Sequence, residues 1–498
     1  MQTYLGIDAG TQGLAVVLTD QQMNVLATGD GHYDMIPDLA DGCYEQQPGD
    51  WESALVSAMN DLRNNFQDEF TVMAIGISGQ MHGEVLIDAN NDCLGPARLW
   101  CDARNDDEGE ELTDLFGVKM PKRITSARWL WTIRNRNQIA ANTQRITTPS
   151  GWIAHRLTGE WNLGIGDAAG MFPIDQATQN YDESLLNKFR DSFGQDSITD
   201  LSKLLPAVRV AGQPAGSLNE HGASLLGLPS GIPVAAAEGD QPAAMAGSLI
   251  GEAGMVSVSF GTSVCANSIG DRSFNGVSQA VDHFCAADGK PINMVWLRNG
   301  TTYMNCLVEM FGKALPAGQD PFANLMPQVI DAPADCGGLL ALPFMDDEPG
   351  LGVLHGGKAS IIGLNESNAT PGNVIKAALL ATMFNLKLGS EVLDLQGFPR
   401  TELILTGGLT RTPQLAQILS DLFETPVTLL ESAAEGTAWG AALLAKFRHL
   451  NQDNQQTNWP EFLSDSQTGN RKRFTPDSNS SQVYQQVFKS YTELLKRD

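Results

Sequence analysis

The chain has 498 residues, of which 42% are hydrophobic and 18% are charged, and its formal net charge is −26. The composition is that of a globular protein, and the length favours two or more domains over a single core. Proteins that bind nucleic acids or anionic membranes use clustered lysines and arginines, so we expect this acidic chain to bind neither.

Cysteine usage and the lack of targeting patterns predict a cytoplasmic protein. Seven cysteines are scattered along the chain without a CxxC pair, which favours reduced thiols over a disulfide framework or a zinc site. The first residues show neither a basic segment nor the apolar core of a signal peptide. No run of about 18 apolar residues predicts a membrane span.

The first 80 residues alternate between strand-like and helix-like patterns. Apolar strand patterns cover four segments, 4–8, 14–19, 23–28 and 71–77. Helical periodicity covers 49–66, and Asp50 is the expected N-cap of that helix. Such alternation predicts an α/β fold.

A similar unit recurs in the second half of the chain. Residues 254–264 form an alternating strand that reaches a Gly-Thr-Ser turn, and 402–409 form a strand that ends in Thr-Gly-Gly before a helix at 413–423. We interpret the recurrence as an internal duplication of one α/β unit, with a boundary near 246–254.

The turn after the first strand carries a carboxylate, glycines and a hydroxyl, in Asp8, Gly10, Thr11 and Gly13. Glycines let backbone N–H groups approach an anion closely, and the Thr11 hydroxyl can donate to a phosphate oxygen. Because a carboxylate repels phosphate, Asp8 would act by holding a magnesium ion that bridges to the phosphates. The alternative is an ordinary hairpin in which Asp8 accepts hydrogen bonds from turn amides.

Two later turns, at 259–263 and 406–410, are glycine-containing but lack an acidic residue. The first, Ser-Phe-Gly-Thr-Ser, offers hydroxyls and backbone donors that suit the phosphates of a nucleotide. The second, Thr-Gly-Gly-Leu-Thr, has paired glycines that let a base or ribose approach the backbone. Neither matches the P-loop or the dinucleotide fingerprint, so both of those binding modes, and with them a dehydrogenase, are disfavoured.

Asp240 and His82 are further candidates for chemistry. Asp240 follows a short apolar strand and precedes Pro242, so it could be a general base for a hydroxyl, the N-cap of a helix at 242–249, or both. His82 follows the strand at 71–77, at the strand end where α/β proteins bind ligands. A purely structural histidine is the alternative for His82.

Seven short motifs occur in order along residues 6–423. They are GIDAGTQG (6–13), GISGQMHG (76–83), LWCDAR (99–104), GDAAG (166–170), EGDQPAA (238–244), SFGTS (259–263) and TGGLTRTPQLAQILSDLF (406–423). The ordered set resembles the FGGY carbohydrate kinases, and among them most closely the xylulokinases. EQQPGDW (45–51) is also similar to a segment of that family, and the resemblance covers roughly residues 4–446.

The resemblance implies two ribonuclease-H-like α/β domains, of the actin and hexokinase type, with a cleft between them. An N-terminal domain at 1–246 would hold the sugar and the catalytic base, and a C-terminal domain at 247–446 would hold the nucleotide. Residues 447–498 would pack on this two-domain body. The polar composition of 451–483 predicts a loop there, and the pattern at 481–496 predicts a final helix.

The resemblance further implies ATP-dependent phosphoryl transfer to a sugar hydroxyl in that cleft. Asp240 matches the base that accepts the proton of the attacking hydroxyl, and Asp8 matches the residue that positions Mg²⁺. Both carboxylates are candidate metal ligands. The expected partners are ATP, Mg²⁺ and a small sugar, and a homodimer is common among relatives.

The same resemblance assigns residues to the two substrates. Those matched to the sugar site are Met81, His82, Asp102, Arg123 and Gln241. Those matched to the nucleotide site are Thr11, Gln12, Gly261, Thr262, Gly407, Gly408 and Thr412.

The implied reaction is phosphorylation of a terminal hydroxyl of a ketopentose, D-xylulose to D-xylulose 5-phosphate. Ribulose, L-xylulose and sedoheptulose are alternative acceptors, and a catalytically inactive sugar-sensing protein is an alternative function. Two departures from the family pattern bear on the acceptor: a different loop at 341–357, and Glu238 in place of a small residue. Near Asp240, Glu238 would raise the pKa of that carboxylate by repulsion, but strand alternation predicts that it points away.

Overall fold

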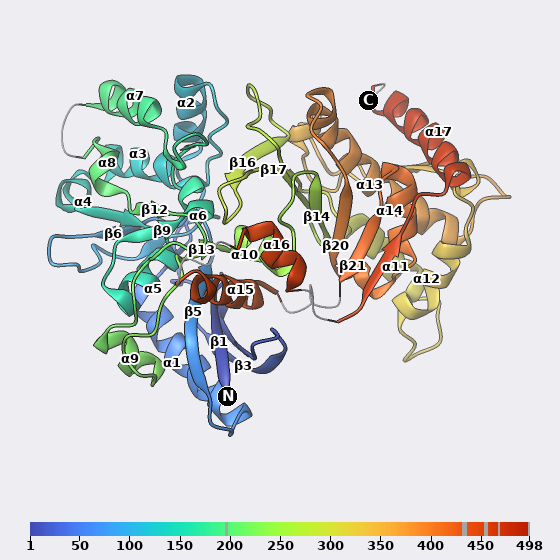
Figure 1. The fold of residues 1–498 in the computed structure, drawn as a ribbon. Helices are drawn as coiled ribbons and strands as arrows, with labels where there is room; N and C mark the ends of the chain where they lie inside the picture. The colour runs from blue at the N-terminus through green and yellow to red at the C-terminus, as the bar shows by residue number, and fades with distance from the viewer. Residues whose placement is uncertain (195–197, 431–435, 453–456, 467–468, 497–498) are drawn as a thin grey trace.

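The computed structural model describes residues 1–194, 198–430, 436–452, 457–466 and 469–496. Two mixed β-sheets lie in separate halves of the molecule, each with helices packed on it, and the chain runs from the first half into the second (Figure 1). This architecture is the predicted α/β fold.

The first sheet has the strand order β13-β5-β1-β2-β3. Its strands are β1 (Gln2–Ala9), β2 (Gly13–Thr19), β3 (Val25–His32), β5 (Thr71–Gly79) and β13 (Glu238–Gly239). Strand β2 is antiparallel to β1 and to β3, whereas β5 is parallel to β1 and β13 is parallel to β5. The four predicted N-terminal strands are therefore confirmed.

The second sheet has the order β16-β17-β15-β14-β20-β21-β22. Its strands are β14 (Met255–Phe260), β15 (Val264–Ile269), β16 (Val281–Cys285), β17 (Pro291–Leu297), β20 (Glu402–Gly407), β21 (Val427–Leu430) and β22 (Arg471–Phe474). Strand β14 pairs antiparallel with β15 and parallel with β20, and β20 pairs parallel with β21. This repeats the pairing of β1 with β2 and β5, so the predicted duplication is confirmed in the topology.

Helices and short strands complete each half. In the first half they are β4 (Glu45–Gln46), α1 (Pro48–Asn65), β6 (Val85–Ile87), β7 (Ala97–Arg98), α2 (Asp106–Phe116), α3 (Thr125–Asn135), α4 (Asn137–Asn142), β8 (Arg145–Thr147), α5 (Pro149–Thr158), β9 (Asn162–Gly164), α6 (Ile165–Ala169), β10 (Ile174–Asp175), β11 (Asn180–Tyr181), α7 (Glu183–Phe193), α8 (Leu201–Leu204), β12 (Ala207–Arg209), α9 (Glu220–Leu226) and α10 (Asp240–Gly247). In the second half they are α11 (Thr302–Gly312), α12 (Pro321–Asp331), η1 (Cys336–Gly338), β18 (Leu340–Leu342), η2 (Pro349–Leu351), β19 (Ser360–Ile362), α13 (Pro371–Leu395), η3 (Gly408–Arg411), α14 (Leu415–Phe423), α15 (Gly436–Leu450), α16 (Trp459–Asp465) and α17 (Ser478–Leu495).

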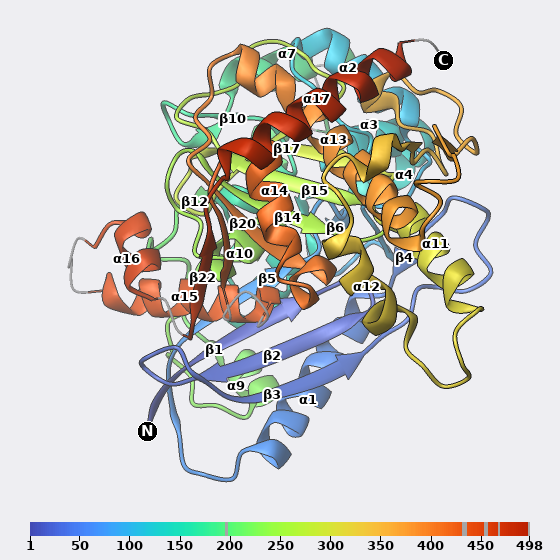
Figure 2. The same ribbon diagram turned by 90° about the vertical axis from the view of Figure 1, so that its right-hand side faces the viewer.

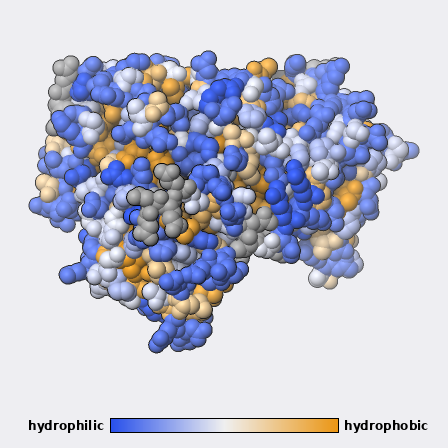
Figure 3. All heavy atoms as spheres, viewed as in Figure 1, coloured by the Kyte–Doolittle hydropathy of each residue, from blue (hydrophilic) through white to orange (hydrophobic). Residues whose placement is uncertain are grey.

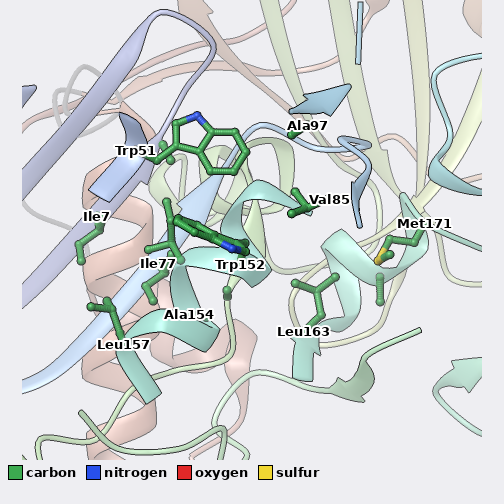
Figure 4. Close-up of a cluster of buried hydrophobic side chains, with 14 of the residues drawn as sticks. Ile7, Trp51, Ile77, Val85, Ala97, Trp152, Ala154, Leu157, Leu163 and Met171 are labelled. Carbon is green, nitrogen blue, oxygen red and sulfur yellow. The ribbon is translucent and has the colours of Figure 1, made fainter. Parts of the chain in front are cut away.

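Large apolar side chains fill the space beneath the first sheet. Ile7 of β1 and Ile77 of β5 are fully buried and are grouped with Trp51 of α1 and Trp152 of α5 (Figure 4). The two tryptophan rings meet edge to face, with centroids 5.6 Å apart. This packing anchors β1 and β5 close to the ends near which Asp8 and His82 lie.

Helix α15 lies on the opposite face of the first sheet, although it belongs to the last part of the chain (Figures 1 and 2). Two glycines make room for it: a Cβ added at Gly6 would lie 1.9 Å from the Ala438 carbonyl oxygen, and one at Gly76 would lie 1.8 Å from that of Ala441. Gly440 of α15 meets α10 in the same way, because its Cβ would lie 1.9 Å from the Ala243 carbonyl oxygen. Helices α10 and α15 thus pack backbone to backbone between the two sheets.

The structure corrects two predicted helix starts. Helix α1 begins at Pro48 after Gln47 as N-cap, so Asp50 lies in the first turn and is not the cap. Proline is favoured at the first helical position because its φ is already fixed near the helical value. Helix α10 begins at Asp240 and not at 242, because Gly239 is its N-cap.

The prediction of a loop over 451–483 is wrong for three described segments. Residues 459–465 form α16, and residues 471–474 form β22, which pairs antiparallel with β21 at the edge of the second sheet. Residues 478–483 are the first residues of α17. An edge strand tolerates charged side chains such as Arg471 and Lys472, which removed the apolar signal of a strand. Residues 453–456 and 467–468 lie outside the described residues. The final helix is confirmed as α17.

The surface in view is dominated by hydrophilic residues, with scattered apolar ones (Figure 3). Across the described ranges, no helix has both the length and the apolar character needed to cross a membrane.

The close approach of α15 to β5 predicts the effect of a single methyl group. We expect Gly76→Ala to lower the free energy of unfolding by about 3 kcal/mol, because the added Cβ would overlap the Ala441 carbonyl oxygen. Gly49→Ala in α1 is the matched control, since nothing lies within 4 Å of its Cβ position. Thermal denaturation of the two variants checks this; equal Tm values would contradict the packing argument.

Candidate active site at the junction of the two halves

Asp8 and Asp240 lie on the same edge of the first sheet. Asp8 is the penultimate residue of β1 and pairs with Ser78 of β5. On the other side of β5, Glu238 pairs with the same Ser78, and Asp240 follows β13 directly. Neighbouring strands are about 4.8 Å apart, so the two backbones are separated by two strand spacings, about 10 Å. The structure therefore brings the two predicted carboxylates together.

Hydrogen bonds from both halves of the chain hold the Asp8 carboxylate. The Ser78 hydroxyl donates to Oδ1 at 2.8 Å, and the Thr437 hydroxyl, at the start of α15, donates to Oδ2. Burial raises the pKa of Asp8, and these two hydrogen bonds offset part of the rise. Thr437 is 429 positions from Asp8 and follows no recognisable motif, so no sequence pattern predicts this contact.

Asp240 combines partial exposure with a strongly raised pKa. Burial, followed by the negative charges of Asp8 and Asp167, raises the pKa of Asp240 to about 7. The N-cap of α10 is Gly239, and no side chain caps this helix, so the capping alternative for Asp240 is wrong. A carboxylate with a pKa near neutrality is suited to accept a proton from a hydroxyl.

Two fully buried carboxyl groups, Glu238 and Asp167, lie behind Asp240. Glu238 is turned toward α6, where the backbone N–H of Asp167 donates to it at 2.9 Å. Its carboxyl group fills the space in which a Cβ of Gly164 or Gly166 would lie. Glu238 therefore points away from Asp240, as strand alternation predicts. The Thr148 and Ser150 hydroxyls each donate to Oδ2 of Asp167 at 2.6 Å.

His82 lies at the bottom of the predicted sugar site in a left-handed conformation, with φ of 65°. Its Nδ1 lies 2.9 Å from the Gly170 carbonyl oxygen, which can only accept, so Nδ1 is the protonated nitrogen. Burial, together with the positive charge of Arg123, lowers the pKa of His82 to about 3. The ring is therefore neutral at physiological pH, and Nε2 is an acceptor for a hydroxyl donor. Met81 packs beside it, against Gly239.

Arg128, which the sequence analysis did not single out, braces the loops of the sugar side. This fully buried arginine of α3 donates to the carbonyl oxygens of His82 at 3.1 Å, Trp100 at 2.7 Å and Asp102 at 3.1 Å. The Arg128 guanidinium thereby fixes the backbone on both sides of the predicted sugar residues. Its partners are 26 to 46 positions away, so no local pattern marks it.

Both carboxylate oxygens of Asp102 accept hydrogen bonds from the protein itself. Its oxygens accept from the Arg104 guanidinium, at 2.6 Å for Nη2, and from the backbone N–H of Tyr44 at 2.9 Å. Although burial alone would raise the pKa of Asp102, Arg104 lowers it overall. The observed role of this carboxylate is to shape the loop, and its contact with a sugar stays a prediction.

The second sheet reaches the sugar side as well. Arg123 forms an ion pair with Asp282 of β16, and the Asn267 side chain of β15 donates to Gln241 Oε1 at 3.0 Å. The Phe284 ring lies 5.4 Å from that of His82, measured between centroids. Sequence motifs had placed every sugar residue in the first half, so Asn267, Asp282 and Phe284 were missed.

A pocket of about 840 Å³ in the second half gathers most of the predicted nucleotide residues. Gly261 and Thr262 line it from the β14–β15 turn, and Gly408 and Thr412 line it from the segment after β20. Gly407 lies beside it with φ of 75°, and its Cβ would come within 2.7 Å of the Ser259 hydroxyl. The pocket therefore unites two motifs that are about 145 residues apart in the sequence.

Thr11 and Gln12 lie elsewhere, on the β1–β2 turn beside Asp8. Neither lines the 840 Å³ pocket. The Thr11 hydroxyl accepts a hydrogen bond from the Trp100 indole at 3.0 Å, and Gln12 is exposed. Their contact with a nucleotide therefore stays a prediction.

The carboxylates near Asp8 suit a magnesium ion that also binds phosphate oxygens and water. Among the described residues, no group of three or more His, Cys, Asp or Glu side chains could form a protein cage for a metal ion. Magnesium is commonly held by one or two carboxylates together with phosphate oxygens and water. Asp8 and Asp240 are the two carboxylates available for such a site.

The loop at 341–357, which differs from the family pattern, reaches a cavity that both halves line. Within the loop, the Glu348 carboxylate accepts from the backbone N–H of Asn299 at 3.0 Å. The next two residues, Pro349 and Gly350, line a cavity of about 500 Å³ together with Arg123 and Asp282. The loop is therefore placed to influence what reaches the sugar side.

Family models match almost the whole chain. The N-terminal domain of the FGGY family of carbohydrate kinases matches residues 3–247, and its C-terminal domain matches 256–448. The chain belongs to the FGGY family of carbohydrate kinases. An FGGY kinase transfers a phosphoryl group from ATP to a sugar, and the predicted family, fold and enzyme class are thus confirmed.

The curated and solved relatives of this FGGY kinase match it over most or all of its length. It is 27% identical to the xylulose kinase of Haemophilus influenzae over 459 residues, which cover 89% of this chain and 90% of that one. Its fold matches the crystal structure of xylulose kinase from Rhodospirillum rubrum with a TM-score of 0.84 at 20% identity, over 99% and 98% of the two chains. It matches gluconate kinase from Lactobacillus acidophilus with a TM-score of 0.83 at 19% identity, over 100% and 98%. The fold alone therefore does not select the acceptor.

The buried Glu238 predicts how the stability of this kinase depends on pH. Burial and the charge of Asp167 raise the pKa of Glu238 from 4.5 to about 8. Between these values the folded protein keeps a proton that the unfolded chain releases, so this group's contribution to stability falls as pH rises from about 4.5 to 8. Glu238→Gln, which cannot ionise, should lose less Tm than wild type between pH 6 and pH 8.5.

Differential scanning fluorimetry across this pH range measures the effect. Glu160→Gln, which removes an exposed carboxylate of the same half, is the control and should follow the wild-type curve. Parallel curves for wild type and Glu238→Gln would contradict the raised pKa.

Proposed function

We propose that this kinase phosphorylates the terminal hydroxyl of a ketopentose, converting D-xylulose to D-xylulose 5-phosphate at the expense of ATP. The curated relatives from Haemophilus influenzae, Lactococcus lactis and Escherichia coli are named xylulose kinase, at 27% identity. The observation that carries the catalytic part of the proposal is the juxtaposition of Asp8 and Asp240, with the pKa of Asp240 raised to about 7.

In the proposed mechanism Asp240 accepts the proton of the attacking hydroxyl. Phosphoryl transfer depends mainly on positioning and on charge stabilisation, so the protein supplies a base, donors and a closed site. With a pKa near 7, Asp240 is largely ionised at slightly alkaline pH yet basic enough to take the proton as the new P–O bond forms.

Asp8 is the proposed site for Mg²⁺, with Asp240 as the second carboxylate. Magnesium, when bound, neutralises the charge of the nucleotide phosphates. The Ser78 and Thr437 hydroxyls hold the Asp8 carboxylate in place while leaving it partly exposed at the sheet edge. In a chain of net charge −26, such neutralisation is needed to bring a triphosphate next to two carboxylates.

The nucleotide is proposed to occupy the 840 Å³ pocket of the second half. Gly261 and Thr262 would donate to the phosphates, and Gly407, Gly408 and Thr412 would face the adenosine. Thr11 and Gln12 would meet the phosphate end from the first half. The support for this arrangement is that one pocket collects residues from both glycine turns.

The acceptor is proposed to lie between Asp240 and His82. The neutral His82 would accept a hydrogen bond from a sugar hydroxyl at Nε2, while Met81 supplies an apolar wall. Gln241 and Arg123 are the proposed donors to the sugar oxygens, and Asp102 orders the neighbouring loop.

Boundaries and assembly also stay proposals. We propose domains at 1–246 and 247–446 with 447–498 packed on both, although α15 of the second segment lies on the first sheet. A homodimer in the cytoplasm is the proposed state of the enzyme.

A panel of acceptors tests the proposed function. With ATP and Mg²⁺, we expect ADP formation in a coupled assay to show the highest kcat/KM for D-xylulose among D-ribulose, L-xylulose, sedoheptulose, glycerol and gluconate. If D-xylulose is inert and another polyol is rapidly consumed, the assignment of the acceptor is wrong while kinase activity stands.

Removal of the base tests the mechanism. Asp240→Ala should lower kcat by about 10³-fold, because the proposed acceptor of the hydroxyl proton is removed, while calorimetry still detects binding of the sugar. Asp92→Asn, at an exposed turn of the same half, is the control and should retain wild-type kcat. Wild-type turnover in Asp240→Ala would show that the base is another residue.

A further inference from the structure

One face of the second sheet is turned toward the first half. The registers place Cys265 opposite Trp296, Asn267 opposite Met294, and Asp282 opposite Met294, so these side chains share a face. The other face, with Val281, Val295 and Leu297, packs in one core cluster with α13. Apolar residues of the first face contact Met81, Ile165 and Met245. Asp282 adds a carboxylate to this face of the sheet.

Asp282 binds two cations of the first half. Lys119 Nζ lies 2.9 Å from Oδ1, and Arg123 Nη2 contacts Oδ2. Both cations belong to the segment 117–124 between α2 and α3, whereas Asp282 lies on β16. Burial alone would raise the pKa of Asp282, but the charges of Arg123 and Lys119 hold it below its ordinary value, so this buried group is ionised. The two ion pairs therefore join the halves.

Arg123 lies next to the groups that surround the proposed acceptor. Its guanidinium carbon is 5.7 Å from the centroid of the Phe284 ring, which in turn adjoins His82. Its positive charge lowers the pKa values of both His82 and Asp240, so its field reaches both ends of the proposed acceptor position. Asp282 takes up only the Nη2 group of the guanidinium. A guanidinium carries five N–H donors, so Arg123 has further donors that could serve an oxygen acceptor beside it.

A cavity between the halves adjoins the same ion pair. It has a volume of about 500 Å³, and its lining includes Lys119, Arg123, Asp282 and Trp296. An arginine on a surface loop of such a cavity would sample many rotamers in the absence of a partner, at a cost in entropy when it binds a ligand. A buried, ionised carboxylate on the facing sheet removes most of that freedom beforehand.

We propose that Asp282 is a positioning residue that holds the Arg123 guanidinium against the acceptor, so that the second sheet takes part in sugar recognition. The inference rests on the proposed function, in which Arg123 donates to the sugar. It assigns to Lys119 the supporting role of neutralising the second oxygen of Asp282. Because the partners come from different halves, the acceptor site is complete only when the halves are as close as they are here.

Steady-state kinetics of Asp282→Asn test the proposal on the acceptor that wild type uses. The amide has the size of the carboxylate but lacks its charge, so Arg123 loses its anchor. We expect KM for the sugar to rise about tenfold, with kcat and KM for ATP within about twofold of wild type. Asp288→Asn is the matched control, because Asp288 lies in the same β16–β17 hairpin but pairs with Lys290 within its own half, at 2.6 Å. It should keep the wild-type KM.

A double-mutant cycle separates positioning from general stability. If Asp282 acts through Arg123, the variant Arg123→Met should show the raised KM, and adding Asp282→Asn to it should raise KM no further. Asp282→Glu keeps the charge and should give an intermediate KM, which serves as the second variant if Asp282→Asn does not fold.

These measurements distinguish failure of the positioning role from failure of the proposed function. If wild type is active and Asp282→Asn has an unchanged KM for the sugar, the positioning role is wrong and the proposed function stands. If Asp282→Asn does not fold, an unchanged KM in both Asp282→Glu and Arg123→Met leads to the same conclusion. Additive effects of the two substitutions overturn it as well. A wild type that phosphorylates no acceptor overturns the proposed function, and this inference with it.

Discussion

The backbone-to-backbone packing of α15 determines the geometry of the site. The helix lies on Gly6 and Gly76 of the first sheet at distances that no side chain would permit. In that position its first turn carries Thr437 to the Asp8 carboxylate, and its Gly440 receives α10, at whose N-terminal end Asp240 lies. The positions of both catalytic candidates, Asp8 and Asp240, thus depend on one helix from the end of the chain. The parallel strands β1, β5 and β13 bring the two residues to the same edge of the sheet.

The burial of several carboxyl groups in one place is the second constraint. Burial raises the pKa values of Asp8, Asp167 and Asp240, and the charges of Asp8 and Asp167 raise that of Asp240 further. The result is useful for a kinase, since a carboxyl group with a pKa near 7 is a better proton acceptor than an ordinary aspartate. The positive charge of Arg123, which forms an ion pair with Asp282, offsets part of this rise at Asp240.

The acceptor is selected by side chains and not by the fold. Structures named xylulose kinase and gluconate kinase match this chain with TM-scores of 0.84 and 0.83, so the two-sheet architecture accommodates different acceptors. What differs between such enzymes must lie in the lining. In this chain the proposed lining comes from both halves, with His82 and Gln241 from the first and Asn267, Asp282 and Phe284 from the second.

The sequence by itself determined the strands β1, β2, β3, β5, β14 and β20, the recurrence of one strand unit in each half and the residues that follow strand ends. Those features are local: apolar alternation specifies β1 and β5, and a carboxylate or a glycine turn directly after a strand must lie at the sheet edge where ligands bind. Only the tertiary structure decided which of these residues lie together, and which residues outside any motif support them. Thr437, Arg128, Asp282 and the Glu238–Asp167 pair carry no local pattern, because their partners are brought close by folding alone. The charged edge strand β22 was invisible for a related reason, since pairing with β21, and not burial of its own side chains, makes it a strand.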